Sequence, residues 1–287
     1  DLFVLNLVLL PLVLPFRRGK SEKEISGQYI GIFIGLLLGS LTKIFTFPAL
    51  AGISILEALS LIKKRINCLS FIFFSITIIA CGIALIRPIQ ISRSLNMKGL
   101  GGHGFGLDVL LDAGYVPEVS SGILLKLLFL GIGLALYTKP ILSRLRFLAQ
   151  KDGPSLINQL QIVGTNFRAM GSSELYTITS TLIIAPLYMA TESINYKWIF
   201  LLPTVACLIA SASKSPGVLH KTKQVYLAIA IICSQALLSY PYSSTTYLYL
   251  EWLGHFAIHP FIVGGLASLS IYLLIKDNDF TAKAQGT

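Results

Sequence analysis

A glycine-rich stretch around a histidine is the first feature that could do chemistry. Gly101, Gly102 and Gly104 flank His103, and an apolar run opens at Leu107. Backbone N–H groups that no side chain covers, placed before a helix N-terminus, attract anions because the helix dipole adds partial positive charge. We therefore predict that these residues bind an anion. The alternative is a flexible connection outside the membrane; a nucleotide site is disfavoured because no strand precedes the stretch.

Three charged side chains lie inside apolar runs or at their edges: Lys126, Glu57 and Glu192. A charge in lipid is costly unless it faces protein, water or a partner, so each is a functional candidate. We predict that Lys126 attracts the anion, and that Glu57 or Glu192 gates it or transfers protons. The alternative is that these side chains reach the nearer membrane interface.

His255 and His259 are four residues apart, so on a helix both rings lie on one face. Two such imidazoles could ligate haem or a metal, but Pro260 disrupts the helix there and no cysteine or acidic third ligand is adjacent. We therefore predict no metal and no other cofactor. No Ser-His-Asp arrangement, HExxH motif or phosphate-binding loop is present, so we predict that the chain is not an enzyme.

The composition is that of a membrane protein. Of 287 residues, 54% are hydrophobic and 13% are charged, against roughly 25% charged in soluble domains. The net charge of +10 comes from basic residues in short connections between apolar runs, without a basic-aromatic patch, so we expect a lipid bilayer and no nucleic acid as partner. The four cysteines lie in or beside apolar runs without CxxC spacing and are predicted to be packing residues: Cys68, Cys81, Cys207 and Cys233.

We predict an all-α, polytopic membrane protein of about eight to ten short, tilted or broken helices. Residues 1–287 form a single transmembrane domain, with 277–287 as a polar tail, and an apolar run already under way after Asp1 predicts a piece of a longer protein. Residues 139–168 are predicted as a basic loop with partly amphipathic stretches. The predicted apolar runs are 2–16, 29–61, 68–86, 119–137, 174–191, 198–212, 225–240 and 255–275.

The run 29–61 is too long for one membrane crossing and is predicted to be a tight helical hairpin. Pro48 ends the first helix near Thr46 and begins the second, because proline lacks an N–H and disfavours helix before it. Small residues recur at helical spacing and allow close approach between helices: Gly31, Gly35, Gly39, Ser40, Ala49, Ala51, Gly52 and Ser54.

Basic and neutral connections alternate along the chain. Lys and Arg against Asp and Glu number four to two in 17–24, three to none in 63–65, five to one in 139–168 and three to none in 214–223. The counts are three to three in 87–118, one to one in 192–197 and none to one in 241–253. The positive-inside rule then predicts that the basic loops are cytoplasmic. Pro186 and Pro203 fall inside short runs, and broken helices in lipid favour transport over simple anchoring.

Several of these residues resemble motifs of the CLC chloride channels and chloride/proton antiporters. Phe45, Thr46, Pro48, Ala51, Gly52 and Glu57 are similar to the family's F-N-A-P-L-A-G-x-x-F-x-x-E helix, and Thr179, Ser180, Glu192, Tyr196 and Pro203 resemble its second-half counterpart. Residues 99–130 resemble the G-x-G-Y-G loop and the K-L-L helix of that family. The family's G-S-G-I-P, G-R-E-G-P and G-x-F-x-P motifs and its late tyrosine have no counterpart here.

The resemblance implies transmembrane transport of a small, chloride-like inorganic anion, as a channel or exchanger, and a possible homodimer. Because the anion-coordinating motifs differ, it does not carry over ion selectivity or proton coupling. The expected mechanism is electrostatic: helix N-termini and glycine N–H groups replace the hydration of the anion. The alternative class is a membrane scaffold or complex subunit in which the same glycines only pack helices.

Overall fold

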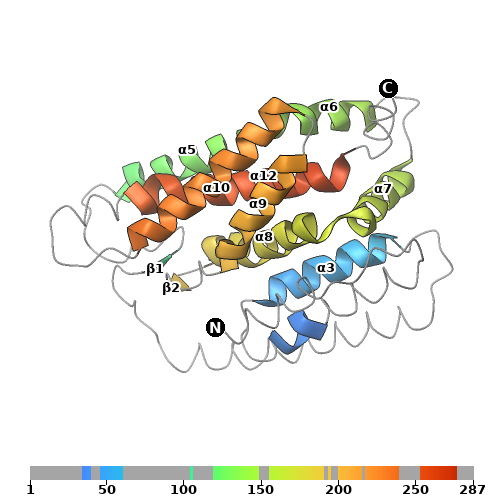
Figure 1. Ribbon diagram of the computed structural model, residues 1–287, viewed down its shortest axis with the longest axis horizontal. Helices are drawn as coiled ribbons and strands as arrows, with labels where there is room; N and C mark the ends of the chain where they lie inside the picture. Colours follow the sequence, from blue (N-terminus) through green and yellow to red (C-terminus); the bar gives the residue numbers. More distant parts are fainter. Residues whose placement is uncertain are drawn as a thin grey trace.

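The computed structural model describes residues 34–39, 46–60, 104–105, 119–148, 155–190, 193–194, 200–214, 217–238 and 253–276. This part of the chain is all-α, as predicted, apart from one pair of two-residue strands (Figure 1). A short helical segment at 34–39 precedes the first of the longer helices. The predicted runs 2–16 and 68–86, the tail 277–287, Cys68 and Cys81 lie outside the described residues.

The elements, in chain order, are α3 (Phe47–Ser60), β1 (Gly104–Phe105), α5 (Val119–Ala135), α6 (Thr138–Leu148), α7 (Leu156–Ala169), α8 (Ser172–Ala190), β2 (Ser193–Ile194), α9 (Leu202–Lys214), α10 (Val218–Leu238), the π-helical turn η3 (Gly254–Ile258) and α12 (His259–Ile275). Helices predicted over 119–137, 174–191 and 255–275 are confirmed as α5, α8 and η3 with α12. The second helix of the predicted hairpin is confirmed as α3, with Pro48 in its first turn.

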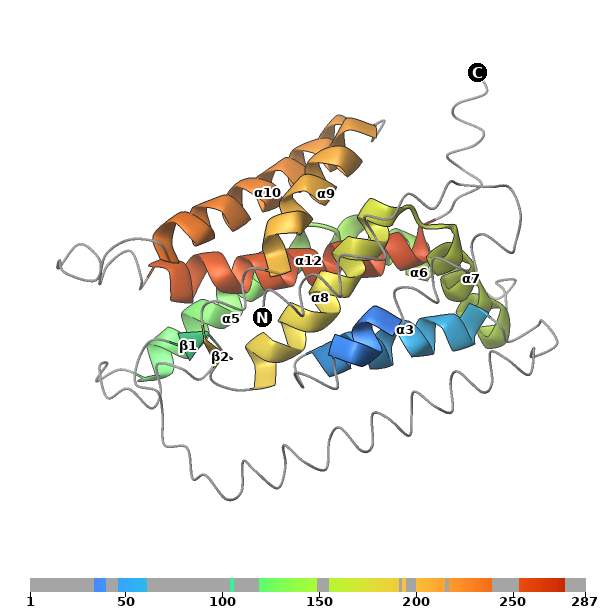
Figure 2. The same cartoon turned by 60° about the horizontal axis from the view of Figure 1, so that its bottom comes forward.

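Helix α12 is the centre of the bundle. It packs most extensively on α5 and also contacts α6, α7, α8, α10 and η3. In Figure 2, α9 and α10 lie on one side of α12, and α8 and then α3 lie on the other. A helix that is apolar all round, as α12 is, belongs in the interior of such an arrangement.

Helices α5 and α12 approach each other to backbone contact at two glycines. A Cβ added at Gly133 would stand 2.3 Å from the Phe261 carbonyl oxygen, and one added at Gly264 would stand 2.2 Å from the Leu130 carbonyl oxygen. The Ser268 hydroxyl donates to the Gly133 carbonyl across the same contact, at 3.2 Å. Only glycine leaves room for this approach, which is the role of small residues between closely packed helices.

The small residues predicted to permit close packing in α3 do so against α8. A Cβ at Gly52 would stand 2.8 Å from the Leu182 side chain, and Ala49 is fully buried. Helix α3 also packs on α7, and most of the first helix of the predicted hairpin lies outside the described residues.

The prediction of a basic loop over 139–168 is wrong. Two helices, α6 and α7, occupy most of this segment, and the Ser155 hydroxyl caps α7 by accepting from the Asn158 N–H at 3.4 Å. Lysine, arginine, glutamine and leucine are good helix formers, and α7 gains a packed face against α3. Counting charges identified the composition of the segment but not its structure.

One helix boundary and the effects of two prolines also differ from the predictions. Helix α10 begins at Val218 rather than 225, so part of the predicted basic connection is its first turns. Pro203 is the second residue of α9 and interrupts nothing, because the first turn of a helix needs no proline N–H, whereas Pro186 does lie inside α8. Pro260 does not break its helix, because the π-helical turn η3 precedes it and runs directly into α12.

Within the described residues, one helix, Phe256–Ile275, is long and apolar enough to cross a membrane by itself. The pair Leu124–Ala135 and Thr138–Phe147, bent by 59°, meets the same criterion when taken together. Helices α3 and α9 are shorter apolar helices.

Candidate functional site

Lys126 lies in the interior of the bundle. Its side chain is 2% exposed, and its ammonium nitrogen stands 5.6 Å from the centroid of the Phe256 ring in η3. A cation over an aromatic face is attracted by the negative charge of the ring at this distance. The packing of η3 on α5 therefore holds the amino group away from solvent.

The glycine-rich stretch meets the segment that follows Glu192. In the antiparallel ladder of β1 and β2, Gly104 pairs with Ile194 and Phe105 pairs with Ser193. The ladder lies at the end of the bundle where α5 begins (Figure 1). Of the predicted site residues, Gly101, Gly102, His103 and Glu192 fall outside the described residues.

Glu57 is not near Lys126 in the fold. It is half-buried in α3, which packs on α7 and α8, whereas α5 packs on α12, η3 and α6. Figures 1 and 2 both place α3 and α5 on opposite sides of α8. The structure therefore does not bring these two predicted site residues together.

Of the two histidines four residues apart, the side chain of His255 lies outside the described residues. His259 is 1% exposed at the start of α12, and Cys207 and Cys233 are free thiols. Across the ranges that the structure describes, no group of three or more His, Cys, Asp or Glu side chains could hold a metal ion.

A polar cluster that the sequence did not indicate lies where α5, α10 and α12 meet. We call Tyr137, His220, Lys223, Gln224 and Tyr272 the helix-end cluster. The His220 ring stands 5.4 Å from the Tyr137 ring and 5.1 Å from the Tyr272 ring, and the two tyrosines stack at 5.5 Å. The Lys223 ammonium donates to the Leu136 carbonyl and lies 5.2 Å from the Tyr137 ring centroid.

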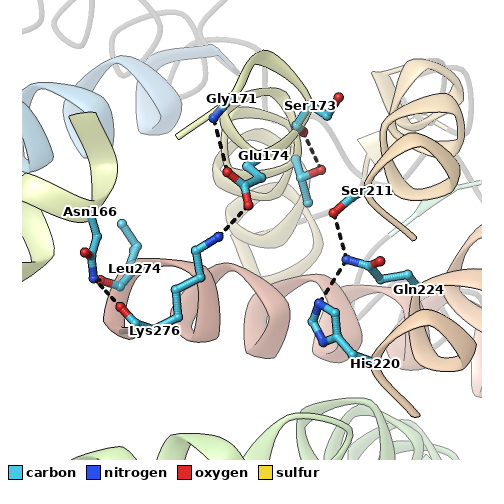
Figure 3. Close-up of polar contacts among 10 residues, drawn as sticks. Asn166, Gly171, Ser173, Glu174, Ser211, His220, Gln224, Leu274 and Lys276 are labelled. Carbon is cyan, nitrogen blue, oxygen red and sulfur yellow. Dashed lines mark hydrogen bonds and ion pairs between the residues drawn. The ribbon is translucent and has the colours of Figure 1, made fainter. Parts of the chain in front are cut away.

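Further hydrogen bonds tie this cluster to α9. The Gln224 amide donates to the Ser211 hydroxyl at 3.0 Å and lies 3.2 Å from His220 Nε2 (Figure 3). The cluster thus joins the first turns of α10 to the last turn of α9, to the turn after α5, and to the last turns of α12.

An ion pair connects the C-terminal end of α12 to the first turn of α8. The Lys276 ammonium lies 2.5 Å from Glu174 Oε1, and Glu174 Oε2 accepts from the Gly171 N–H at 3.1 Å (Figure 3). The Asn166 amide donates to the carbonyls of Leu274 and Lys276, at 2.9 and 2.7 Å. These contacts satisfy carbonyls that the C-terminus of α12 leaves open.

Burial of His220 lowers its pKa below the ordinary value of 6.5, and the positive charges of Lys276 and Lys223 lower it further, against an opposing effect of Glu174. The imidazole is therefore neutral in the folded protein at neutral pH. Because the unfolded chain binds the proton at higher pH, this neutral histidine contributes stability above pH 6.5 that is lost as the pH falls toward the lowered value.

We expect acid to destabilise the wild-type protein more than a His220→Phe variant. Phenylalanine keeps an aromatic ring between the tyrosines and cannot bind a proton. The measurement is Tm in detergent at about pH 8 and about pH 5, compared between the two proteins so that shared carboxylates cancel. Equal decreases in both proteins would contradict the assignment.

Two buried tyrosines differ in the hydrogen bonding of their hydroxyl groups, so their phenylalanine variants can be compared. The Tyr137 hydroxyl is buried without a hydrogen-bond partner among the described residues, whereas the Tyr176 hydroxyl donates to the Phe200 carbonyl at 3.0 Å. We expect Tyr176→Phe to lower stability by about 1 kcal/mol and Tyr137→Phe to leave it unchanged or raise it. Thermal unfolding of both variants in one detergent checks this, and a lower Tm for Tyr137→Phe would mean that its hydroxyl has a partner.

The sequence carried a weak signal for the helix-end cluster. His220, Lys223 and Gln224 lie three and four residues apart at the start of one apolar run, and Tyr272 lies near the end of another. Such spacings mark one face of a helix but do not identify its partner.

The fold and these sites define an all-α bundle with a buried lysine at one end and a polar aromatic cluster at the other. No protein-family model, no curated protein and no solved structure matches the chain.

Proposed function

We propose that the chain is a multi-pass membrane protein that carries a small inorganic anion across the bilayer, as a channel or an exchanger. The observation that carries the proposal is the burial of Lys126, 2% exposed, inside an otherwise apolar helix. A buried ammonium is costly in a membrane protein unless it serves a substrate path or a partner, and an anion is the ligand that it attracts.

The distribution of side chains supports membrane embedding. The outer faces of α5, α9 and α10 expose large apolar side chains, among them Leu124, Leu128, Ile209, Tyr226 and Ile232. Interior hydroxyls instead bond to one another between helices, as Thr204 does to Ser180 at 2.9 Å and Ser270 does to Thr181 at 3.0 Å. An apolar outside and hydroxyls between helices are typical of proteins in lipid.

The two ends of the bundle differ in charge. Helix α6 with its arginines and the first turns of α10 lie toward one end, whereas β1, β2 and the start of η3 lie toward the other (Figure 1). The latter end adjoins Lys126 and the N-termini of α5 and η3, whose dipoles add positive potential. The asymmetry supports an orientation with the basic end cytoplasmic.

The test is anion efflux from liposomes that contain the purified full-length chain. Vesicles loaded with potassium chloride are made permeable to potassium with valinomycin, and released chloride is measured with an electrode. We expect chloride release above that of protein-free vesicles that are treated in the same way. Release equal to that of empty vesicles, with the reconstituted chain shown to be helical and monodisperse, would overturn the proposal.

The alternative function is a scaffold or complex subunit without a permeation path. The tight contact of Gly133 and Gly264 favours it, because that contact serves packing alone. The same efflux measurement separates the two functions, since a folded scaffold releases no chloride.

A further inference from the structure

Helix α6 leaves the direction of α5 at a sharp turn. The two helices are bent by 59° across Leu136 and Tyr137. The Leu136 N–H donates to the Gly133 carbonyl at 3.1 Å, and the Thr138 hydroxyl donates to the Leu134 carbonyl at 2.9 Å, so the bend is hydrogen-bonded on both sides. The change of direction is thus a built feature of the fold.

The two helices differ in length, and only α5 is long enough to cross most of a bilayer core. Helix α5 has 17 residues and is about 26 Å long, close to the roughly 30 Å of a bilayer core. Helix α6 has 11 residues and is about 16 Å long, too short to cross. A chain that has nearly crossed in α5 therefore reaches the membrane surface near the start of α6.

The exposed side of α6 combines apolar and basic side chains. Leu142 and Leu145 are each 46% exposed and lie three residues apart, on one side of the helix. Lys139 and Arg146 are exposed and lie seven residues apart, next to this apolar strip, while Ile141 is turned toward the bundle. An apolar strip beside basic residues is the pattern of a helix that lies in the plane of a membrane interface.

The charged residues of α6 and of the helices on which it packs are all basic. Residues 138–148 contain three basic and no acidic residues. Helices α5 and α12, on which α6 packs, contain no acidic residue either. The Arg144 guanidinium stands 4.9 Å from the centroid of the exposed Phe147 ring.

We propose that α6 is an interfacial helix that binds anionic phospholipids. Leu142 and Leu145 face the upper part of the acyl chains, and Lys139 and Arg146 bind headgroup phosphates, because basic side chains near an anionic surface are attracted to it. The inference rests on the membrane embedding proposed above but not on anion transport.

The position of α6 is tested by depth measurement in phospholipid nanodiscs. Nitroxide labels are placed singly at 139, 142, 143 and 145 in a chain whose native cysteines are replaced, and their accessibility to oxygen and to a water-soluble nickel complex is compared. We expect 142 and 145 to be deep and 139 and 143 to be shallow. A depth that changes steadily by about 1.5 Å per residue would show a spanning segment and overturn the proposal. Uniform access to the nickel complex would overturn it as well.

The lipid preference is tested with charge-removing and charge-preserving variants. Brominated phosphatidylglycerol and brominated phosphatidylcholine are compared as quenchers of a fluorophore at position 142. We expect Lys139→Gln with Arg146→Gln to reduce the preference for phosphatidylglycerol on the order of tenfold, and Lys139→Arg with Arg146→Lys to preserve it. An unchanged preference in the glutamine variant would refute the headgroup contacts. Because neither readout measures chloride, failure here is distinguishable from failure of the transport proposal.

Discussion

Replacing Gly133 by alanine is expected to lower the free energy of unfolding by about 3 kcal/mol, the upper part of the range for overpacked cores. The new Cβ would stand 2.3 Å from the Phe261 carbonyl oxygen and 2.7 Å from the Gly265 nitrogen. Both are backbone atoms, so no side-chain rotation relieves the contact, and α5 must separate from α12. Because this is the most extensive helix contact described, the loss reaches the whole bundle.

The matched control lies two residues away on the same helix. Gly131 has nothing within 4 Å of an added Cβ, so Gly131→Ala removes a glycine from α5 without a clash. We expect this control to keep or raise stability, because alanine is the better helix former. Thermal unfolding in detergent and the monodisperse fraction on gel filtration measure both variants. If Gly133→Ala and Gly131→Ala had the same Tm and the same monodisperse fraction, the close approach of α5 and α12 would be wrong.

The reciprocal glycine provides an independent check on the same contact. A Cβ at Gly264 would meet the Leu130 carbonyl oxygen at 2.2 Å, so Gly264→Ala should resemble Gly133→Ala in size. Combining the two is expected to cost less than the sum of the single effects, because the first methyl group has already separated the helices.

Replacing Lys126 by methionine is expected to reduce chloride efflux on the order of tenfold or more if the chain transports anions. Two opposite unit charges 4 Å apart attract each other by about 4 kcal/mol at the effective dielectric constant near protein surfaces. A tenfold change in flux corresponds to about 1.4 kcal/mol, so loss of this attraction is large enough to produce it. Methionine keeps a long unbranched side chain beside Phe256 and removes the charge together with the hydrogen-bond donors of the ammonium. Lys126→Arg keeps the charge and the contact with the ring, and should retain most of the flux.

The stability of the same variants separates an electrostatic role from a packing role. Efflux is expressed per folded protein, and Tm is measured in parallel. The transport role predicts a large loss of flux for methionine at nearly unchanged Tm. A lower Tm with unchanged flux per folded protein would instead assign Lys126 to packing and would favour the scaffold.

Local sequence was sufficient for much of the secondary structure. The apolar runs behind α5, α8 and α12 are about as long as the helices that they form, and Pro48 marks the start of α3. Helix formation depends on residues within a few turns, so the helices in such runs can be predicted from the local sequence alone. The same locality explains the error over 139–168, because α6 and α7 have mixed composition and α7 owes its place to packing on α3.

The candidate sites were only partly readable. Lys126 stands out in the sequence because a charge within an apolar run is rare, and the structure shows that its side chain is buried. The sequence did not predict that Glu57 lies apart from Lys126, or that Gly104 pairs with Ile194. Two-residue strands have no periodicity from which to predict them.

By itself, the sequence determined that this chain forms apolar helices, roughly where they lie, and which charged residues are costly among them. Only the tertiary structure decided that Tyr137, His220 and Tyr272 meet and that Gly133 faces Gly264. The physical reason is that burial follows from composition along one helix, whereas contact depends on which faces of different helices pair. Helix α12 is apolar on every face, so its own sequence does not determine which face packs against which neighbouring helix.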